Sequence, residues 1–133
     1  MLKLFGGRKP RVLLLNNNRK EIGAFAGFVS DGEFEVLTAA RGDLGVKAAE
    51  RIRPGLIVLD CELPGNSGWE TLSALKNNKK TSAIPVLMRA ARGSQACADK
   101  ALSCGAQGYL TGRDRATVVA AKITRRLGRA ARA

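Results

Sequence analysis

The sequence lacks histidine altogether and has few cysteines, and both shortages exclude kinds of chemistry. Without histidine, the chain has no imidazole for general-base catalysis and lacks the commonest protein metal ligand. Its three cysteines, Cys61, Cys97 and Cys104, form no Cys-x-x-Cys pair, so the sequence argues against a thiolate metal site. They are interpreted as small, partly buried apolar residues. We therefore expect no enzyme.

Long apolar runs are also missing. No run approaches the roughly 18 residues that cross a membrane, and residues 1–10 lack the apolar region of a signal peptide. We therefore expect no membrane span and a cytoplasmic protein. The chain has 133 residues, of which 45% are hydrophobic and 26% charged. These values are typical of one folded domain with a real core.

Acidic residues are scarce, and their distribution is uneven. Lysine and arginine total 23 against 11 acids, a net charge of +12. Residues 89–133 contain 10 basic and 2 acidic residues, so this last third supplies +8 of that charge. The asymmetry indicates an anionic partner near the C-terminal end: an acidic protein surface, nucleic acid or anionic lipid. A merely solubilising basic surface explains it almost as well.

The most informative stretch contains four consecutive apolar residues, Leu56 to Leu59, followed at once by Asp60. Pro64-Gly65 and Gly68 then supply turn residues. A short continuous apolar run bounded by turns is typical of a strand buried on both faces. The carboxylate would lie at the carboxyl end of that strand, where open α/β sheets place their sites.

The rest of the chain alternates short apolar runs with amphipathic segments. The predicted strands are 11–15, 34–38, 56–60, 85–88 and 108–110, with 34–38 near an edge of the sheet. Three of the predicted helices are 19–30, 95–103 and 115–130. A further helix is capped by Asp43 and closed by Pro54-Gly55, and another is capped by Ser67 and ends at the polar run 77–80.

Each predicted helix has an apolar side that should face the sheet. These inward residues are Ile22, Phe25, Ala26 and Val29; Leu44, Ala48 and Ile52; Trp69, Leu72 and Leu75; Ala98 and Leu102; and Val119, Ile123 and Leu127. Five β-α units with doubly buried strands predict an α/β fold, a five-stranded doubly wound parallel sheet. We expect a basic leader at 1–10 that the sequence allows to be disordered, a single domain at 11–130, and a tail at 131–133.

Three motifs in this order resemble the response-regulator receiver domain of two-component signalling, over about residues 10–130. Leu56 to Asp60 with the following Leu63-Pro64-Gly65 and Gly68 is similar to the family's phospho-acceptor strand and loop. Residues 84–88 and 105–110 are similar to its fourth and fifth strands, and the latter include the switch aromatic at Tyr109. The resemblance implies the (βα)5, flavodoxin-like receiver fold.

The resemblance also implies a site in which Asp60 is the phospho-acceptor. In the family, two acids at the end of the first strand hold Mg²⁺ with the acceptor. A Thr or Ser after the fourth strand and a Lys after the fifth bind the phosphoryl group. This sequence departs at each of these positions, where it has Asn16, Asn17, Ala90 and Gly112. The resemblance is therefore to a degenerate variant, a pseudo-receiver.

The departures predict a weak or absent Mg²⁺ site. Mg²⁺ usually requires one or two carboxylates, and asparagine retains the oxygen while losing the charge. Phosphoryl transfer depends on positioning and charge neutralisation, so ordinary phosphorylation of Asp60 should fail. Two features leave a divergent phospho-acceptor open: Glu62 as a replacement metal ligand, and Arg89, Arg92 or Arg113 as a replacement positive charge. Otherwise Asp60 is a hydrogen-bonded relic.

Tyr109 has two interpretations. In the family, this aromatic moves inward as the Thr or Ser moves toward the phosphate. Ala90 has no hydroxyl to move but leaves more room, so Tyr109 either rests permanently inward or is a plain surface residue.

The last helix is the predicted partner surface. Arg115, Lys122 and Arg129 recur every seven residues, with Arg125, Arg126 and Arg132 beside them and Arg113 just before. We expect a phosphorylation-independent interaction module whose partner has an acidic protein surface, with a homodimer as a further option. A solvated helix exterior is the bland alternative. Nucleic-acid binding is less favoured, because aromatic residues for base stacking make up only 5% of the chain.

Overall fold

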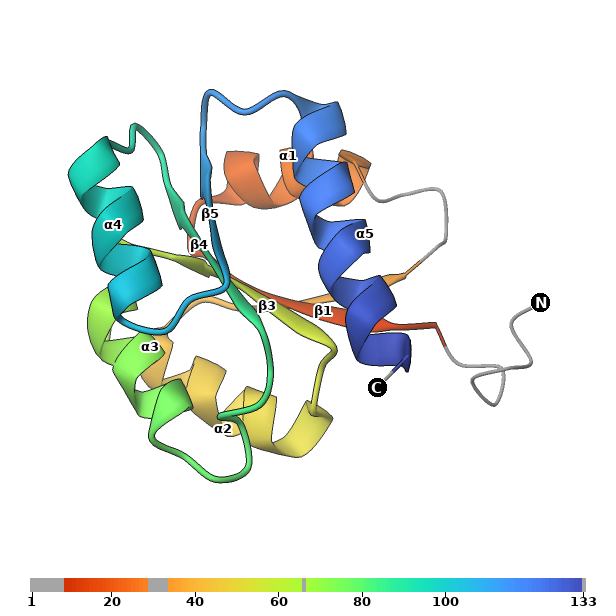
Figure 1. Ribbon diagram of the computed structural model, residues 1–133, viewed down its shortest axis with the longest axis vertical. Coiled ribbons are helices and arrows are strands. Elements are labelled where there is room, and N and C mark those ends of the chain that lie inside the picture. The colour runs from red at the N-terminus through yellow and green to blue at the C-terminus, as the bar shows by residue number, and fades with distance from the viewer. Residues whose placement is uncertain (1–8, 29–33, 66, 133) are drawn as a thin grey trace.

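The computed structural model describes residues 9–28, 34–65 and 67–132, which form one parallel sheet covered by helices on both faces (Figure 1). The strands are β1 Arg11–Leu15, β2 Glu35–Ala39, β3 Leu56–Asp60, β4 Val86–Ala90 and β5 Gly108–Thr111. The helices are α1 Arg19–Phe28, α2 Gly42–Ile52, α3 Gly68–Lys76, α4 Gln95–Ser103 and α5 Ala116–Arg132.

The strand order is β2-β1-β3-β4-β5, and every pair is parallel. This arrangement confirms the predicted five-stranded doubly wound fold and the edge position of the second strand. Central β3 is buried along its whole length, as its unbroken apolar run predicts. Neighbouring carboxyl ends meet at one edge of the sheet, with Asp60 in register with Arg89 of β4. The candidate site forms there.

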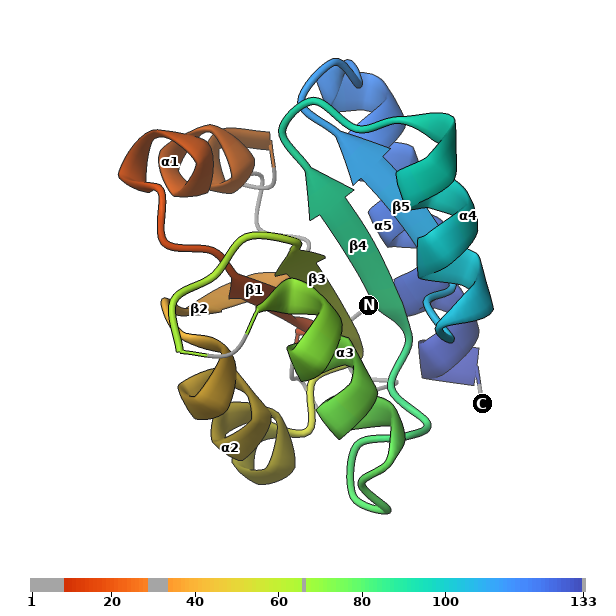
Figure 2. The same ribbon diagram turned by 90° about the vertical axis from the view of Figure 1, so that its left-hand side faces the viewer.

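Successive strand residues point to opposite faces and build two separate cores. Val12, Leu14 and Val58 pack with Phe25 of α1 and Ile123 of α5. The opposite face packs the alternate strand residues against α2, α3 and α4, through Ala49, Leu72, Leu75 and Ala101. Figure 2 shows the three helices of that second layer in front of the sheet. Helices on both faces leave the ends of the strands as the place for chemistry.

Several predicted helix faces are confirmed. Val119, Ile123 and Leu127 of α5 are buried, as are Leu72 and Leu75 of α3. Ser67 caps α3 with a complete capping box, in which its side chain accepts a hydrogen bond from the Glu70 backbone N–H. Trp69 is half-buried, and the Lys100 ammonium of α4 lies 4.4 Å from its ring centroid.

Three predicted inward residues are instead exposed: Ala26, Leu44 and Leu102. In α2 the buried positions are Gly42, Gly45 and Ala49. A Cβ on Gly45 would lie 2.3 Å from Cδ2 of Leu15, so the helix packs through a glycine and turns Leu44 outward. In α4 the residue against the sheet is Ala101, one position from the predicted Leu102. Close helix-sheet packing therefore selects small residues over the larger apolar neighbours.

Two helix starts differ from prediction. Helix α5 begins at Ala116, one residue after the predicted start at 115, and extends to Arg132, into the predicted tail at 131–133. The larger difference is in α2. Arg41, and not Asp43, is the N-cap residue of α2. Asp43 lies in the first turn, where its carboxylate accepts from the Leu44 backbone N–H and the Arg41 guanidinium. Val29 and most of the predicted leader lie outside the described residues. Among the described residues, no helix combines the length and apolar character needed to cross a membrane.

The start of α3 lies directly on the end of β3, and Gly68 permits this contact. A Cβ at Gly68 would lie 2.2 Å from the Asp60 carbonyl oxygen and 2.5 Å from Cα of Cys61. Both neighbours are backbone, so neither can move aside cheaply. The packing of α3 therefore fixes the backbone that carries Asp60.

Gly68→Ala should lower the free energy of unfolding by about 1–3 kcal/mol, because the new methyl group overpacks this contact. Urea denaturation followed by circular dichroism measures the change. Gly23→Ala is the matched control, since a Cβ at Gly23 meets nothing within 4 Å. It should stabilise α1 by about 0.5–1 kcal/mol through helix propensity. Equal effects of the two substitutions would contradict this account of Gly68.

Candidate functional site

The site lies at the carboxyl ends of β1, β3 and β4, where Asp60 is nearly buried. Asp60 is 7% exposed and Asn16, directly after β1, is 2% exposed. One carboxylate oxygen of Asp60, Oδ1, accepts a hydrogen bond from the Glu62 backbone N–H at 2.8 Å. The other, Oδ2, accepts from Asn16 Nδ2 at 3.2 Å and from Arg89 Nη1 at 3.1 Å. Both oxygens of the carboxylate are therefore occupied.

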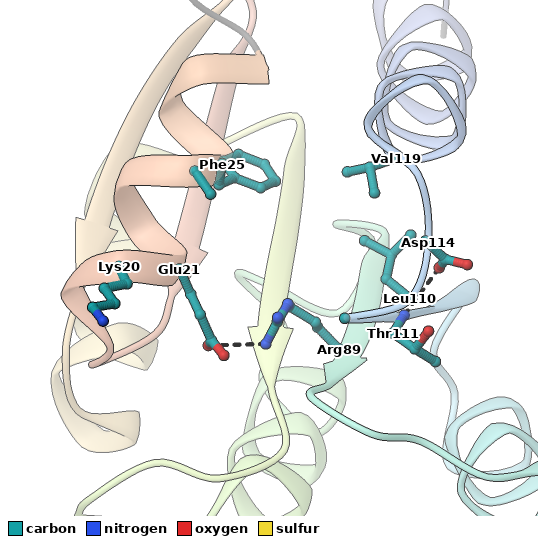
Figure 3. A pocket seen from close by; sticks show the side chains of 10 residues that line it. Lys20, Glu21, Phe25, Arg89, Leu110, Thr111, Asp114 and Val119 are labelled. Atoms are coloured by element: carbon teal, nitrogen blue, oxygen red, sulfur yellow. Dashed lines mark hydrogen bonds and ion pairs between the residues drawn. The ribbon is translucent and has the colours of Figure 1, made fainter.

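A second carboxylate, Glu21 in the first turn of α1, shares the same donors. Arg89 Nη1 lies 2.9 Å from Glu21 Oε1, and Asn16 Nδ2 donates to the same oxygen at 3.1 Å. Figure 3 shows the Glu21 and Arg89 side chains reaching toward each other from α1 and β4. We call Asp60, Asn16, Glu21 and Arg89 the Asp60 network. It places one guanidinium between two carboxylates.

The local fold explains why these four residues meet. Asn16 follows β1 directly, and its Oδ1 accepts from the Asn18 backbone N–H at 2.8 Å. Asn18 in turn accepts hydrogen bonds from the Lys20 and Glu21 backbone N–H groups, which starts α1 beside the site. The parallel register aligns Asp60 with Arg89. The turns held by the Asn16 and Asn18 side chains, together with the β3-β4 pairing, thus bring the four residues of the network together.

Burial dominates the electrostatics of Asp60. It raises the pKa of the carboxyl above its ordinary value of 3.8 and outweighs the opposing effects of the Glu62 N–H and Arg89. Glu21 adds a second negative charge that acts in the same direction as burial. The adjacent thiol is affected more strongly, because burial raises the pKa of Cys61 to about 12. That thiol is therefore unreactive at neutral pH.

The structure shows which of the residues predicted to replace the family's functional groups contact Asp60. Arg89 supplies the positive charge beside Asp60, whereas Arg92 and Arg113 are exposed and make no ion pair or hydrogen bond with Asp60. Glu62 approaches Asp60 only through its backbone N–H, and its side chain is exposed. Asn17 is also exposed. Glu21 was not predicted, because its approach depends on how α1 leaves β1.

The Asp60 network does not fit a Mg²⁺ site. The described residues hold no group of three histidine, cysteine or acidic side chains that could bind a metal. The two carboxylates that do lie together, Asp60 and Glu21, share Arg89 as their counter-charge, and an octahedral hard cation needs free oxygen ligands. The Arg89 guanidinium instead supplies one positive charge between these two carboxylates.

Gly112, where the resemblance to the receiver family implies a lysine, is sterically required to be glycine. A Cβ there would lie 2.5 Å from the Ala91 carbonyl oxygen, while the Gly112 N–H donates to the Ala90 and Ala91 carbonyls. A lysine at this position therefore needs a different loop between β5 and α5. Ala90, half-buried at the end of β4, supplies no hydroxyl.

Tyr109 is half-buried and packs against the α2-α3-α4 core. Its hydroxyl accepts a hydrogen bond from the Ser94 backbone N–H at 3.3 Å, and burial raises its pKa. A Cβ on Gly93 would lie 2.6 Å from this oxygen. The tyrosine therefore covers the loop that precedes α4. This position lies between the two predictions, a side chain permanently turned inward and a plain surface residue.

The basic residues of the predicted partner surface fall into two groups. Lys122 Nζ donates to the Tyr109 carbonyl at 2.9 Å, and Arg126 Nη2 to the Gln107 carbonyl at 2.6 Å. These two therefore fasten α5 to β5. Arg113, Arg115 and Arg125 are exposed. The side chains of Arg129 and Arg132 lie outside the described residues.

Asp60→Asn should stabilise the protein at neutral pH. Because the pKa of Asp60 is raised on folding, the folded protein binds its proton more tightly than the unfolded chain. The carboxylate's contribution to the free energy of unfolding therefore falls as pH rises above 3.8. Asparagine retains the acceptor for the Glu62 N–H and has no charge to desolvate.

Urea denaturation across pH tests this prediction. The stability difference should be present at neutral pH and vanish below the ordinary carboxyl range, where Asp60 is protonated in both states. Asp99→Asn, at an exposed acid of α4, is the control and should leave the pH profile unchanged. A deficit in the stability of Asp60→Asn that grows as pH rises through the carboxyl range would show that the Arg89 ion pair outweighs burial.

Comparison with known proteins places this geometry in a family. The model of the response regulator receiver domain matches residues 12–122. A hybrid signal transduction histidine kinase D of Dictyostelium discoideum is 31% identical over 102 residues, 77% of this chain and 6% of that protein. The phosphate regulon transcriptional regulatory protein PhoB of Rhizobium meliloti is 38% identical over 78 residues, 58% of this chain and 34% of PhoB. This chain thus spans a minor part of each relative's length.

A solved structure agrees with the sequence matches. The crystal structure of the signal receiver domain of a protein described as a LuxO repressor, from Vibrio parahaemolyticus, superposes with a TM-score of 0.84 at 27% identity. The superposition covers 92% of each chain. Both structures are therefore of one fold over nearly their whole length. The parallel sheet, the aspartate that ends β3 and the family match over 111 residues (12–122) together make this chain a member of the response regulator receiver domain family.

Proposed function

We propose that this receiver domain signals without phosphorylation, as a cytoplasmic, non-enzymatic protein-interaction module of a two-component system. The observation that carries the proposal is the Arg89 ion pair with Asp60. The guanidinium lies 3.1 Å from Asp60 Oδ2 and 2.9 Å from Glu21 Oε1, with its side chain only 17% exposed. The acceptor carboxylate is thus held by an internal cation.

Phosphoryl transfer to Asp60 would need Oδ2 free to attack and a positive charge that follows the transferred group. Here Oδ2 already accepts two hydrogen bonds, and no metal-binding group is found among the described residues. Ala90 offers no hydroxyl, and Gly112 no ammonium. A divergent mechanism in which Arg89 replaces the metal is the alternative, and it makes the opposite prediction for phosphoryl mimics.

The exposed part of α5 and the turn before it favour an acidic protein partner. Arg113, Arg115 and Arg125 are exposed there, together with Val118, whose exposed fraction is 40%. The sequence contains no acidic residue after Asp114. A predominantly basic surface around an apolar side chain attracts and then docks a complementary acidic surface. Lys122 donates to a carbonyl of β5 and Arg126 to the carbonyl of Gln107 just before β5, and both bonds hold this surface in place.

The Asp60 network should bind neither Mg²⁺ nor a phosphoryl mimic. An amide NMR titration with millimolar Mg²⁺ and then beryllofluoride, a phosphoryl mimic, should leave the signals of Asn16, Asp60, Ala90 and Tyr109 unmoved. Asn16→Asp/Asn17→Asp/Arg89→Val is the positive control, because it restores two carboxylates and removes the competing guanidinium. It should regain Mg²⁺ binding.

Two results would contradict the prediction that the Asp60 network does not bind these ligands. Clustered, saturable shifts in the wild type would support the divergent phospho-acceptor. If the triple variant folds and also ignores Mg²⁺, the ion pair with Arg89 is not what prevents metal binding.

Partner binding should depend on the exposed arginines before and on α5. Arg113→Glu/Arg115→Glu/Arg125→Glu should lower the affinity for the acidic partner recovered by crosslinking from the source cells by at least about tenfold, because it reverses three surface charges. Lys47→Glu/Arg51→Glu/Lys80→Glu is the matched control: all three residues are exposed on α2 and the α3-β4 loop. Calorimetry at two salt concentrations measures both variants. Equal losses would indicate generic attraction by net charge.

A further inference from the structure

A cavity of about 220 Å³ lies between α1, the end of β5 and the start of α5, beside the Asp60 network. Phe25 of α1, Leu110 of β5 and Val119 of α5 form its apolar wall. Figure 3 shows Phe25 and Val119 on opposite sides of the space, with Arg89 and Leu110 below them. Asp60 does not line this cavity, so it is separate from the phospho-acceptor position.

Arg89 presents unused hydrogen-bond donors here. Its bonds to Asp60 and Glu21 both use Nη1. Nε and Nη2 carry three further N–H groups, and neither has a hydrogen-bond partner among the described residues. Nor is either sealed from solvent, because neither is a buried unpaired atom. This edge of a guanidinium matches a carboxylate in a bidentate manner.

A carboxylate with spare capacity lines the same cavity. Asp114 Oδ2 accepts a hydrogen bond from the Thr111 backbone N–H at 2.9 Å, and Asp114 Oδ1 has no partner among the described residues. The charged residues that line the cavity are Lys20, Arg89, Glu21 and Asp114, so its lining is neutral overall but carries both signs. A neutral ligand with separated charges fits this lining better than an anion or a cation does.

We infer that this cavity binds a small zwitterion with an apolar side chain, that is, an apolar α-amino acid. Its carboxylate would pair with the Nε and Nη2 edge of Arg89, its ammonium with Asp114, and its side chain with Phe25, Leu110 and Val119. A dry cavity of about 150 Å³ accommodates benzene, so the volume suits a leucine-sized molecule. The inference does not depend on whether Asp60 can be phosphorylated.

Amide NMR titration with three matched ligands tests the chemistry. Leucine should cause saturable shifts at Phe25, Thr111 and Val119. Isocaproate retains the carboxylate and lacks the ammonium, whereas isoamylamine retains the ammonium and lacks the carboxylate. Each should bind at least about tenfold more weakly than leucine, because one charge-assisted bond is lost. An analogue that binds as well as leucine would overturn the zwitterion assignment. An unmoved spectrum up to the solubility limit of leucine would overturn the site itself.

Three variants locate the binding. Ala24 is exposed on α1 and lines the cavity, so Ala24→Trp should fill the space without disturbing the core and abolish leucine binding. Asp114→Asn retains an acceptor for the Thr111 N–H and removes the charge, so it should weaken leucine at least about tenfold and leave isocaproate unaffected. Asp99→Asn, at an exposed acid of α4, should change the affinity for neither leucine nor isocaproate. Wild-type leucine affinity in a folded Ala24→Trp variant would place binding elsewhere.

Discussion

The ion pairing of one guanidinium with two carboxylates is the interaction on which the end of the sheet depends. Arg89 joins β4 to Asp60 of β3 and to Glu21 of α1, while Asn16 of β1 donates to both acids. Two carboxylates this close repel each other unless a cation lies between them. In this chain that cation is a side chain of the protein, Arg89.

A side-chain cation changes what a receiver fold can do. A metal ion or a transferred phosphoryl group can arrive and depart, and the fold can then have two states. Arg89 is covalently part of β4, so its guanidinium does not exchange with solvent as a bound metal ion does. Tyr109 is likewise held, with its hydroxyl on the Ser94 N–H. These features support the proposal that signalling resides in surfaces and ligands outside the acceptor position.

The same arginine connects the two proposals. Its Nη1 donates to both acids, and its Nε and Nη2 edge carries the donors that we assign to the cavity between α1 and α5. A ligand bound there would contact the start of α5, close to the exposed Arg113 and Arg115. The cavity and the partner surface thus share a structural element, although each is tested by its own experiment.

The sequence by itself determined the fold class. Doubly buried strands have to be apolar along their whole length, and the runs at 11–15 and 56–59 show this directly. It also determined that Asp60 ends a strand, whereas the expectation that Asn16, Ala90 and Gly112 replace the family's functional groups comes from the resemblance. The Ser67 cap and the buried face of α5 follow from local patterns of three to seven residues.

Tertiary structure alone decided which side chains meet. Arg89 was one of three candidate cations, and only the β3-β4 register selected it. Glu21 joins the network because of the angle at which α1 leaves β1, and Lys122 and Arg126 turn to carbonyls in and just before β5 because α5 lies over that strand. Leu44 and Leu102 face outward because Gly45 and Ala101 allow closer packing. Such contacts join residues distant in sequence, so no local pattern encodes them.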